Sequence, residues 1–216
     1  MNNRNEWFYK MKKKYKVILS IIVIFILLII AFFTVKLLFS KKNNTANIKV
    51  LDSIPNYNYT LDERDSKLMK DTYQELKGIL KEKEINYEDY AKAIAKLFVI
   101  DLFTMNNKIN KYDIGSIEYV YPDSISNFKI NVGDTLYKTL ENNADGKRNQ
   151  KLPAVKSILS SDITKGKYKL NDKEHDAYNV SLSWDYDEDL GYDDSAIITL
   201  IKENKQLYIV QYKKGE

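Results

Sequence analysis

The hydrophobic positions change their pattern along the chain, and the first pattern is an uncharged, almost wholly apolar run near the N-terminus. The nineteen residues from Val17 to Val35 carry no charge, and only Ser20 and Thr34 among them are polar. At about 1.5 Å of rise per residue such a helix is roughly 28 Å long, which matches the hydrocarbon core of a bilayer. A secretory signal has a shorter apolar region and small residues before its cleavage site. We therefore predict a permanent single-pass transmembrane helix over residues 17–39.

The charges on either side of this run predict its orientation. Residues 1–16 contain six Lys and Arg residues and one Glu, whereas the lysines after the run are spread more thinly. The positive-inside rule therefore places residues 1–16 in the cytoplasm, as a basic tail against the lipid bilayer, and the C-terminal part outside the cell membrane. The formal net charge is +4, to which the tail contributes +5 and Lys36 +1, leaving −2 for the remainder. An acidic exported part gives no reason to expect a nucleic-acid partner. The chain has no cysteine, so this part folds without disulfides.

The second pattern, between residues 60 and 140, repeats at intervals near 3.6 and predicts three helices. Residues 40–59 before it are polar without a clear period and are interpreted as a linker. The first helix is predicted to begin at Thr60, because Thr60 and Glu63 have the spacing of a capping box, and the second at Asn86, a favourable N-cap. The third helix follows Asp123. The apolar faces of these helices are Leu61, Leu68, Thr72, Leu76 and Ile79; Tyr87, Tyr90, Ala91, Ile94, Leu97, Phe98 and Met105; and Ile125, Phe128, Val132, Leu136 and Leu140.

From Ala154 onward the apolar positions alternate with polar ones, which is typical of strands. The clearest strand is AYNVSLSWDY at residues 177–186, and weaker or shorter ones cover residues 157–170, 195–203 and 206–212, the last two joined by a turn near Asn204. Helices followed by adjacent strands indicate an α+β fold with the helices on one face of an antiparallel sheet. We predict one extracytoplasmic domain over residues 60–216, with about three helices packed on a sheet of about four strands.

The order of these elements resembles the nuclear-transport-factor-2-like fold, a cone-shaped domain in which a helical layer covers a curved sheet. The segments LFVIDLFTMNNKINKYDIGSIEYVYPDSISNF, KRNQKLP and SWDYDEDLGYDD are similar to a family of small membrane-anchored proteins of Gram-positive bacteria. The predicted plan of the chain consists of a short cytoplasmic tail, one membrane helix, a linker and such a domain. This plan is similar to that of the bitopic assembly-factor subunit of type IV secretion and conjugation systems. The likeness covers most of residues 60–212, and its motifs are structural rather than chemical. It implies a domain that assembles with other envelope or membrane proteins.

Asp101 is the residue with the most unusual position in the pattern. On a helical wheel it falls on the apolar face of the second helix, beside Ile94, Phe98 and Met105. A carboxylate in such a place needs hydrogen-bond partners or has a raised pKa. One interpretation makes it a pocket carboxylate that acts as a base or binds a ligand in the cone. The other makes it a buried structural carboxylate that accepts backbone N–H bonds and fixes the turn NKYDIG. We favour the structural interpretation, because structural networks also perturb carboxylates.

The remaining chemistry-bearing residues do not complete a reaction centre. His175 is the only histidine and is expected in a turn between two strands, which is a poor place for a base that acts with Asp101. A single histidine also excludes multi-histidine metal sites, and its expected place in a turn is a poor one for the imidazole of a triad. The segment DGKR at residues 145–148 lacks the other glycines and the Ser or Thr of a phosphate-binding loop. We therefore expect no catalytic residue and no cofactor.

The acidic segment DYDEDLGYDD resembles a calcium loop only in part. Asp185, Asp187 and Asp189 alternate, as oxygen ligands of Ca²⁺ do. However, Leu190 and Ala196 stand where an EF-hand loop requires Gly and Glu. We interpret the segment as a solvated loop between two strands and expect it to bind no metal.

Three functions are compatible with this sequence. The first is a membrane-anchored extracytoplasmic binding or scaffold protein, which contacts envelope or membrane proteins or forms a homo-oligomer. The second is a small-ligand binder or enzyme that uses the cone cavity with Asp101, and the third is a structural role in envelope or cell-wall assembly. A filled core with an exposed apolar or tyrosine-rich sheet face favours the first, and an open cavity lined by Asp101 favours the second. We expect the first, because the sequence lacks a base–nucleophile pair, a metal set and a cofactor motif.

Overall fold

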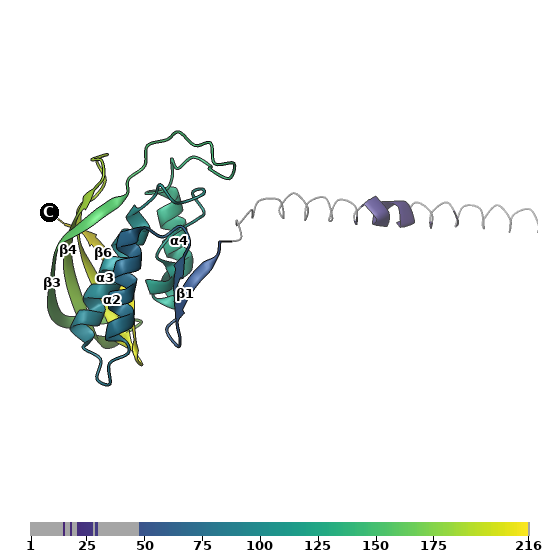
Figure 1. The fold of residues 1–216 in the computed structure, drawn as a ribbon. Coiled ribbons are helices and arrows are strands. Elements are labelled where there is room, and N and C mark those ends of the chain that lie inside the picture. Colours follow the sequence, from purple (N-terminus) through teal and green to yellow (C-terminus); the bar gives the residue numbers. More distant parts are fainter. Residues whose placement is uncertain (1–14, 16–17, 19–20, 28, 30–47, 216) are drawn as a thin grey trace, which may run out of the picture. The chain divides into compact units, whose positions relative to one another are not determined.

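The computed structural model describes residues 15, 18, 21–27, 29 and 48–215 (Figure 1). Residues 15, 18, 21–27 and 29 are helical, and no helix formed by the described residues has the length and apolar character needed to cross a membrane. Most of the predicted span 17–39, nearly all of the basic tail and the first part of the predicted linker lie outside the described residues. The membrane anchor therefore stays a prediction. The chain divides into two units, residues 1–45 and 46–216, and the second unit contains all the strands and helices from residue 50 onward.

The second unit has the α+β architecture that the sequence predicts. Short strands and helices come first, and four longer strands come after them. In chain order the elements are β1 (Val50–Ile54), β2 (Tyr59–Asp62), α2 (Lys67–Ile79), α3 (Tyr87–Phe103), the 3₁₀ turns η1 (Ile117–Tyr119) and η2 (Pro122–Ser124), α4 (Ile125–Asp134), β3 (Val155–Leu170), β4 (Lys173–Tyr186), β5 (Ser195–Glu203) and β6 (Gln206–Lys214).

The four long strands form one antiparallel sheet in the order β3-β4-β5-β6, so each strand pairs with its neighbour in sequence. The β3–β4 hairpin closes at Asn171 and Asp172 and the β5–β6 hairpin at Asn204, all three with positive φ. Asn and Asp tolerate this conformation better than most residues. The predicted strands and the turn near Asn204 are confirmed. His175 differs from its prediction, because it lies in β4 opposite Tyr168 and not in the turn.

Helix α3 lies against the sheet and is covered on its other side by α2 (Figure 1). It contacts β3, β4 and β6 as well as α2, which explains why eleven of its seventeen residues are buried. Its predicted start is confirmed, since the Asn86 side chain accepts hydrogen bonds from the backbone N–H groups of Glu88 (3.0 Å) and Asp89 (3.4 Å). These two acids also complement the positive end of the helix dipole.

The first predicted helix begins later than expected, and part of the predicted linker is folded. Residues 50–54 and 59–62 form the β1–β2 hairpin, so Thr60 is a strand residue and not a helix cap. Helix α2 begins at Lys67, where the Ser66 hydroxyl oxygen accepts a hydrogen bond from the Met69 N–H at 3.1 Å. The folded part of the chain therefore includes residues 50–59. The alternating burial of Tyr59 and Leu61 is a period-two signal that the capping-box spacing obscured.

The third predicted helix is shorter than its apolar pattern. Helix α4 ends at Asp134, whereas the pattern extends to Leu140. After the helix the Tyr137 N–H bonds back to the Val132 carbonyl at 2.8 Å, and its hydroxyl donates to the Leu102 carbonyl at 2.7 Å. Residues 136–140 therefore form turns, not a helix, but they still bury apolar side chains. The spacing of these side chains along the sequence is similar to that of a helix.

The interior of the domain is filled by aromatic side chains. Trp184 of β4 packs against Phe103 of α3, with ring centroids 5.2 Å apart. The hydroxyl groups of Tyr59 and Tyr90 lie 2.7 Å apart, and that of Tyr73 donates to the Tyr59 carbonyl at 3.3 Å. Five tyrosines have no exposed surface: Tyr59, Tyr73, Tyr90, Tyr119 and Tyr137. Of these five hydroxyl groups, only that of Tyr119 has no hydrogen-bond partner among the described residues. Buried tyrosines with bonded hydroxyl groups add packing area without leaving polar atoms unpaired.

Candidate functional site

Asp101 lies in the last turns of α3, and the segment that follows the helix folds back around its carboxylate. The Lys108 ammonium donates to Oδ1, and the backbone N–H of Ser116 donates to Oδ2. The Lys108 side chain is 4% exposed and that of Asp101 16% exposed, so the pair is almost buried. The structural interpretation names backbone N–H donors, and Ser116 supplies one, whereas the Lys108 ammonium is a partner that it does not name. Both carboxylate oxygens are already engaged within the fold.

The backbone of Gly115 and Ser116 packs directly against the Asp101 carboxylate. A Cβ atom on Gly115 would lie 2.8 Å from the backbone oxygen and from both carboxylate oxygens of Asp101. Ser116 has a φ of 65°, and its hydroxyl donates to the Phe98 carbonyl at 2.7 Å. The same hydroxyl also lies 3.4 Å from Asp101 Oδ2, so a serine hydroxyl and a carboxylate are neighbours at this turn, with the shorter hydrogen bond going to the backbone.

A second ion-pair group lies next to this turn. Arg64 donates to Asp113 at 2.5 Å, to Asp62 at 3.3 Å and to the Asn107 carbonyl at 3.3 Å. Burial of Asp113 opposes its charge, but bonds from Arg64 and from the Ile109 N–H outweigh burial and hold the pKa of Asp113 below its usual value. Arg64 thus joins the segment after β2 to the turn after α3.

Two further carboxyl groups form no salt bridge within the described part of the chain. The Glu118 carboxylate accepts from the N–H of Thr60 at 3.2 Å and from its hydroxyl at 2.9 Å. Burial raises the pKa of Glu118 to about 7, and the nearby charge of Asp101 adds to this effect. Asp65 accepts from the Asp62 N–H at 2.6 Å, and burial raises its pKa to about 6. These two groups therefore ionise at higher pH than ordinary carboxyl groups.

These charged groups line an open cleft of about 460 Å³. Its charged walls are formed by four acids and two bases, Asp62, Arg64, Asp101, Lys108, Asp113 and Glu118. The cleft meets the geometric condition of the pocket interpretation, since Asp101 reaches it. The residues that line it can bind a polar group, and the contact of the Ser116 hydroxyl with the Asp101 carboxylate among them is long, at 3.4 Å.

A second, larger cleft of about 800 Å³ lies where three turns meet. Its walls come from the β1–β2 turn, the C-terminal end of α2 and the β5–β6 turn. They combine apolar groups of Ile54, Leu80 and Tyr208 with the ammonium groups of Lys81 and Lys205. Neither of these two lysines forms a salt bridge with another described residue. No sequence motif indicated this cleft, because its residues come from three distant segments.

The other sequence candidates are separate from these clefts. His175 makes no side-chain hydrogen bond or salt bridge with the described residues, and it lines neither cleft. In the acidic loop the Asp189 carboxylate accepts the Gly191 N–H at 2.9 Å, and Asp193 pairs with Lys214 at 2.6 Å. Over residues 48–215 and the few described before them, no group of three or more His, Asp or Glu side chains is placed to hold a metal ion.

The sequence pattern pointed to Asp101 but not to the other charged residues that line the same cleft. Lys108, Asp113 and Glu118 stand in a turn-rich segment where charged residues are ordinary. Arg64 carried a usable signal, because the chain has only three arginines among its many lysines. Arg64 and Arg148 each donate to several acceptors from the fixed, planar arrangement of donors that a guanidinium group provides.

Comparison with known proteins gives no match, since no family model, no curated protein and no solved structure is significantly similar to this chain.

Proposed function

We propose that this chain is a membrane-anchored extracytoplasmic protein that binds and assembles other proteins. The observation that carries the proposal is the filled interior. A cone-shaped domain that binds a small molecule needs an internal cavity, whereas the core of this domain is packed with large side chains, including Trp184 and five fully buried tyrosines. Asp101 is bonded on both oxygens within the fold. The groups left for function are on the surface.

The proposal includes the location of the protein. An uncharged run of nineteen residues suits a permanent single-pass helix, and six basic residues before it favour a cytoplasmic N-terminus. A chain held in a membrane meets partners in the same membrane at a raised effective concentration. Modest surface contacts are then sufficient for assembly.

We further propose that the domain has the nuclear-transport-factor-2-like form and serves a secretion or conjugation apparatus, or the cell envelope. Helices α2 and α3 on one face of an antiparallel meander are compatible with that form. The link to such an apparatus rests on similarity in plan, namely a tail, a membrane helix and one α+β domain. A shared fold by itself does not determine function.

A tyrosine-rich outer sheet face is not the binding surface. Across the central strands this face carries mostly polar side chains, with the exposed Ile197 as an apolar exception and the Thr199 hydroxyl bonded to Asn179 at 2.9 Å and to Gln211 at 3.4 Å. This finding departs from our expectation for a scaffold. It directs attention to the loops and clefts at the ends of the sheet.

The alternative function is binding of a small polar ligand in the cleft beside Asp101. The observation in its favour is that Asp101, Arg64 and Glu118 face one open cleft of about 460 Å³. A ligand there would have to compete with ion pairs that the fold already makes. For this reason we place the alternative second.

Crosslinking of the full chain in intact cells, followed by purification from membranes, tests the proposal. We expect other envelope proteins or further copies of the chain in the crosslinked products. The control is a chain in which the exported residues 46–216 are replaced by an unrelated domain. Recovery of uncrosslinked monomer alone, with several reagents, would contradict the assembly function. Asp101→Asn that abolishes binding of a ligand without loss of stability would favour the alternative.

A further inference from the structure

The acidic loop between β4 and β5 has exposed carboxylates, most of which form no salt bridge with the described residues. Asp187, Glu188 and Asp189 are exposed, and of these only Glu188 forms a salt bridge with a described residue, to the exposed Lys151. Leu190 follows them and is only half-buried. Within the described part of the chain, the loop thus presents two carboxylates without a cationic partner next to an aliphatic side chain. This combination is suited to a cleft with apolar walls and basic edges.

The larger cleft has that complementary chemistry. Ile54, Leu80 and Tyr208 supply apolar surface, and Lys81 and Lys205 are exposed at its edge. Lys77 also lines the cleft but is paired with Asp52. Three lysines and one acid, Glu203, line the cleft, so its lining carries an excess of positive charge. It therefore attracts a carboxylate-bearing segment.

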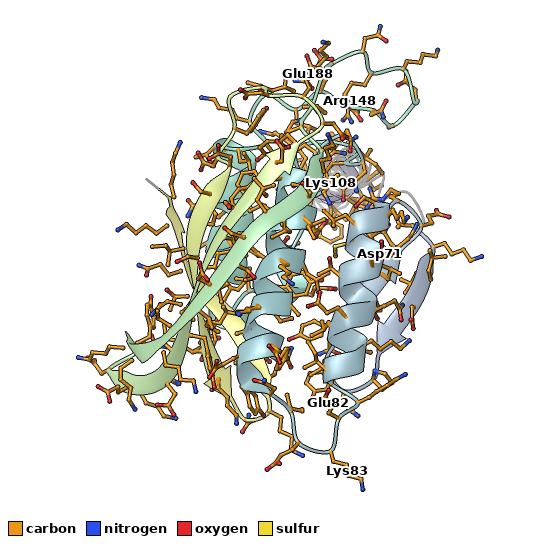
Figure 2. The ribbon with its side chains drawn as sticks, turned by 60° about the vertical axis from the view of Figure 1, so that its left-hand side comes forward. Asp71, Glu82, Lys83, Lys108, Arg148 and Glu188 are labelled. Atoms are coloured by element: carbon orange, nitrogen blue, oxygen red, sulfur yellow. The ribbon has the colours of Figure 1, made fainter. Side chains whose placement is uncertain are left out.

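The loop cannot enter the cleft of its own chain. Strand β5 begins directly after the loop and ends at Glu203, next to the cleft. Nine extended residues at about 3.3 Å each place the two features roughly 30 Å apart. Figure 2 shows the same separation, with Glu188 at one end of the domain and Glu82 and Lys83, which follow Lys81, at the other. A second copy of the chain can bring a loop and a cleft together.

We propose that the loop 187–194 of one copy docks into this cleft of the next copy. Asp187 and Asp189 face Lys81 and Lys205, and Leu190 packs against the apolar walls. Two different surfaces meet in this contact, so it can form twice in a closed two-fold dimer or repeat head to tail in rings and open arrays. The inference rests on the proposed assembly function and names a second copy as its partner.

Engineered cysteines test this contact in the full chain in its membrane, because the natural sequence has none. Glu188→Cys marks the loop and Pro55→Cys marks the cleft, and neither residue is needed for the charge pairing. We expect a disulfide or short crosslink when the two variants, with different tags, are mixed. Each variant alone should give none, because a head-to-tail contact does not bring like positions together. The matched control replaces Pro55→Cys by Lys129→Cys, a likewise exposed position on α4.

Charge reversal tests the chemistry of the contact. Asp187→Lys with Asp189→Lys in the loop variant should reduce crosslinking to the level of the control pair. Lys81→Glu with Lys205→Glu in the cleft variant should do the same. Mixing both reversed variants should restore the crosslink, which also shows that each of them is folded.

Three results would overturn the inference. One is equal crosslinking at Pro55 and at the control position, and another is failure of the reversed pair to restore the product. The third is crosslinking of Pro55→Cys to a different protein but not to a second copy. The third result leaves the assembly function intact, whereas absence of any protein partner at either position counts against both.

Discussion

The almost buried pair of Asp101 and Lys108 makes each residue dependent on the other. The Lys108 side chain is only 4% exposed, so water can replace little of what its partner supplies. Breaking such a pair costs more than the pair contributes, because it leaves an uncompensated charge in the interior. Gly115 belongs to the same arrangement, since any side chain there collides with Asp101.

We expect Asp101→Ala to lower the free energy of unfolding by about 3–5 kcal/mol, the usual cost of an unpaired buried charge. The double variant Asp101→Leu with Lys108→Met should lose clearly less than the sum of the single losses. Urea unfolding of residues 46–216 measures both. Asp71→Ala, on the exposed surface of α2, is the matched control and should change little. An Asp101→Ala protein of unchanged stability would mean that the carboxylate is not structural.

The pKa of Glu118 leads to an unusual dependence of stability on pH. Burial raises this pKa from its usual 4.5 to about 7, so between these values the folded protein binds more protons than the unfolded chain. Stability from this group is therefore complete in acid and is lost as pH rises toward 7 and beyond. The lowered pKa of Asp113 acts in the opposite sense, but in a more acidic range.

We expect Glu118→Gln to weaken the loss of stability between about pH 5 and pH 8, because the amide does not titrate. The measurement is the urea midpoint across that range in wild type and variant. Glu63→Gln, a nearby exposed acid, serves as the control. A variant with the same pH profile as wild type would show that Glu118 ionises normally.

At the scale of elements, the local sequence pattern and the long-range contacts of residues 50–66 favour different secondary structures. The Thr60 and Glu63 spacing favours a helix start, but Thr60 instead pairs with Ser53 in the β1–β2 hairpin and bonds to Glu118. A single sequence cannot show such a partner, which lies 58 residues away. In contrast, the Asn86 cap and strands β4 to β6 were predictable, because their signals are local and their apolar period is clear.

The revised start of α2 can be tested at its cap. Ser66→Ala removes the bond to the Met69 N–H and should lower the free energy of unfolding by about 1 kcal/mol, the typical cost of a lost N-cap. Ser53→Ala, an exposed hydroxyl without a hydrogen bond among the described residues, is the matched control. Unfolding by urea is again the measurement. Equal effects of the two substitutions would contradict a helix that begins at Lys67.

At the scale of the whole molecule, the class of the fold could be predicted from the sequence, but the clefts at the ends of the domain could not. The α+β class was predictable from the order of patterns, because amphipathic helices and alternating strands each bury one face. The two clefts and the partners of Asp101 were not predictable, because they join turns from distant segments. The acidic loop was visible in the sequence, but its separation from the basic cleft depends on the register of β5.

The proposed assembly requires the domain to lie outside the cytoplasm, and this can be tested directly. The six basic residues before the apolar run should retain residues 1–16 in the cytoplasm, since moving them across the bilayer is costly. A reporter that is active only in the cytoplasm should therefore be silent when fused after Glu216. The same reporter fused before the run, at Lys16, should be active. Replacing the lysines of the tail by glutamine and adding lysines after Ser40 should reverse both results. An active reporter after Glu216 in the unaltered chain would show that the orientation is wrong, and partners would then have to be sought in the cytoplasm.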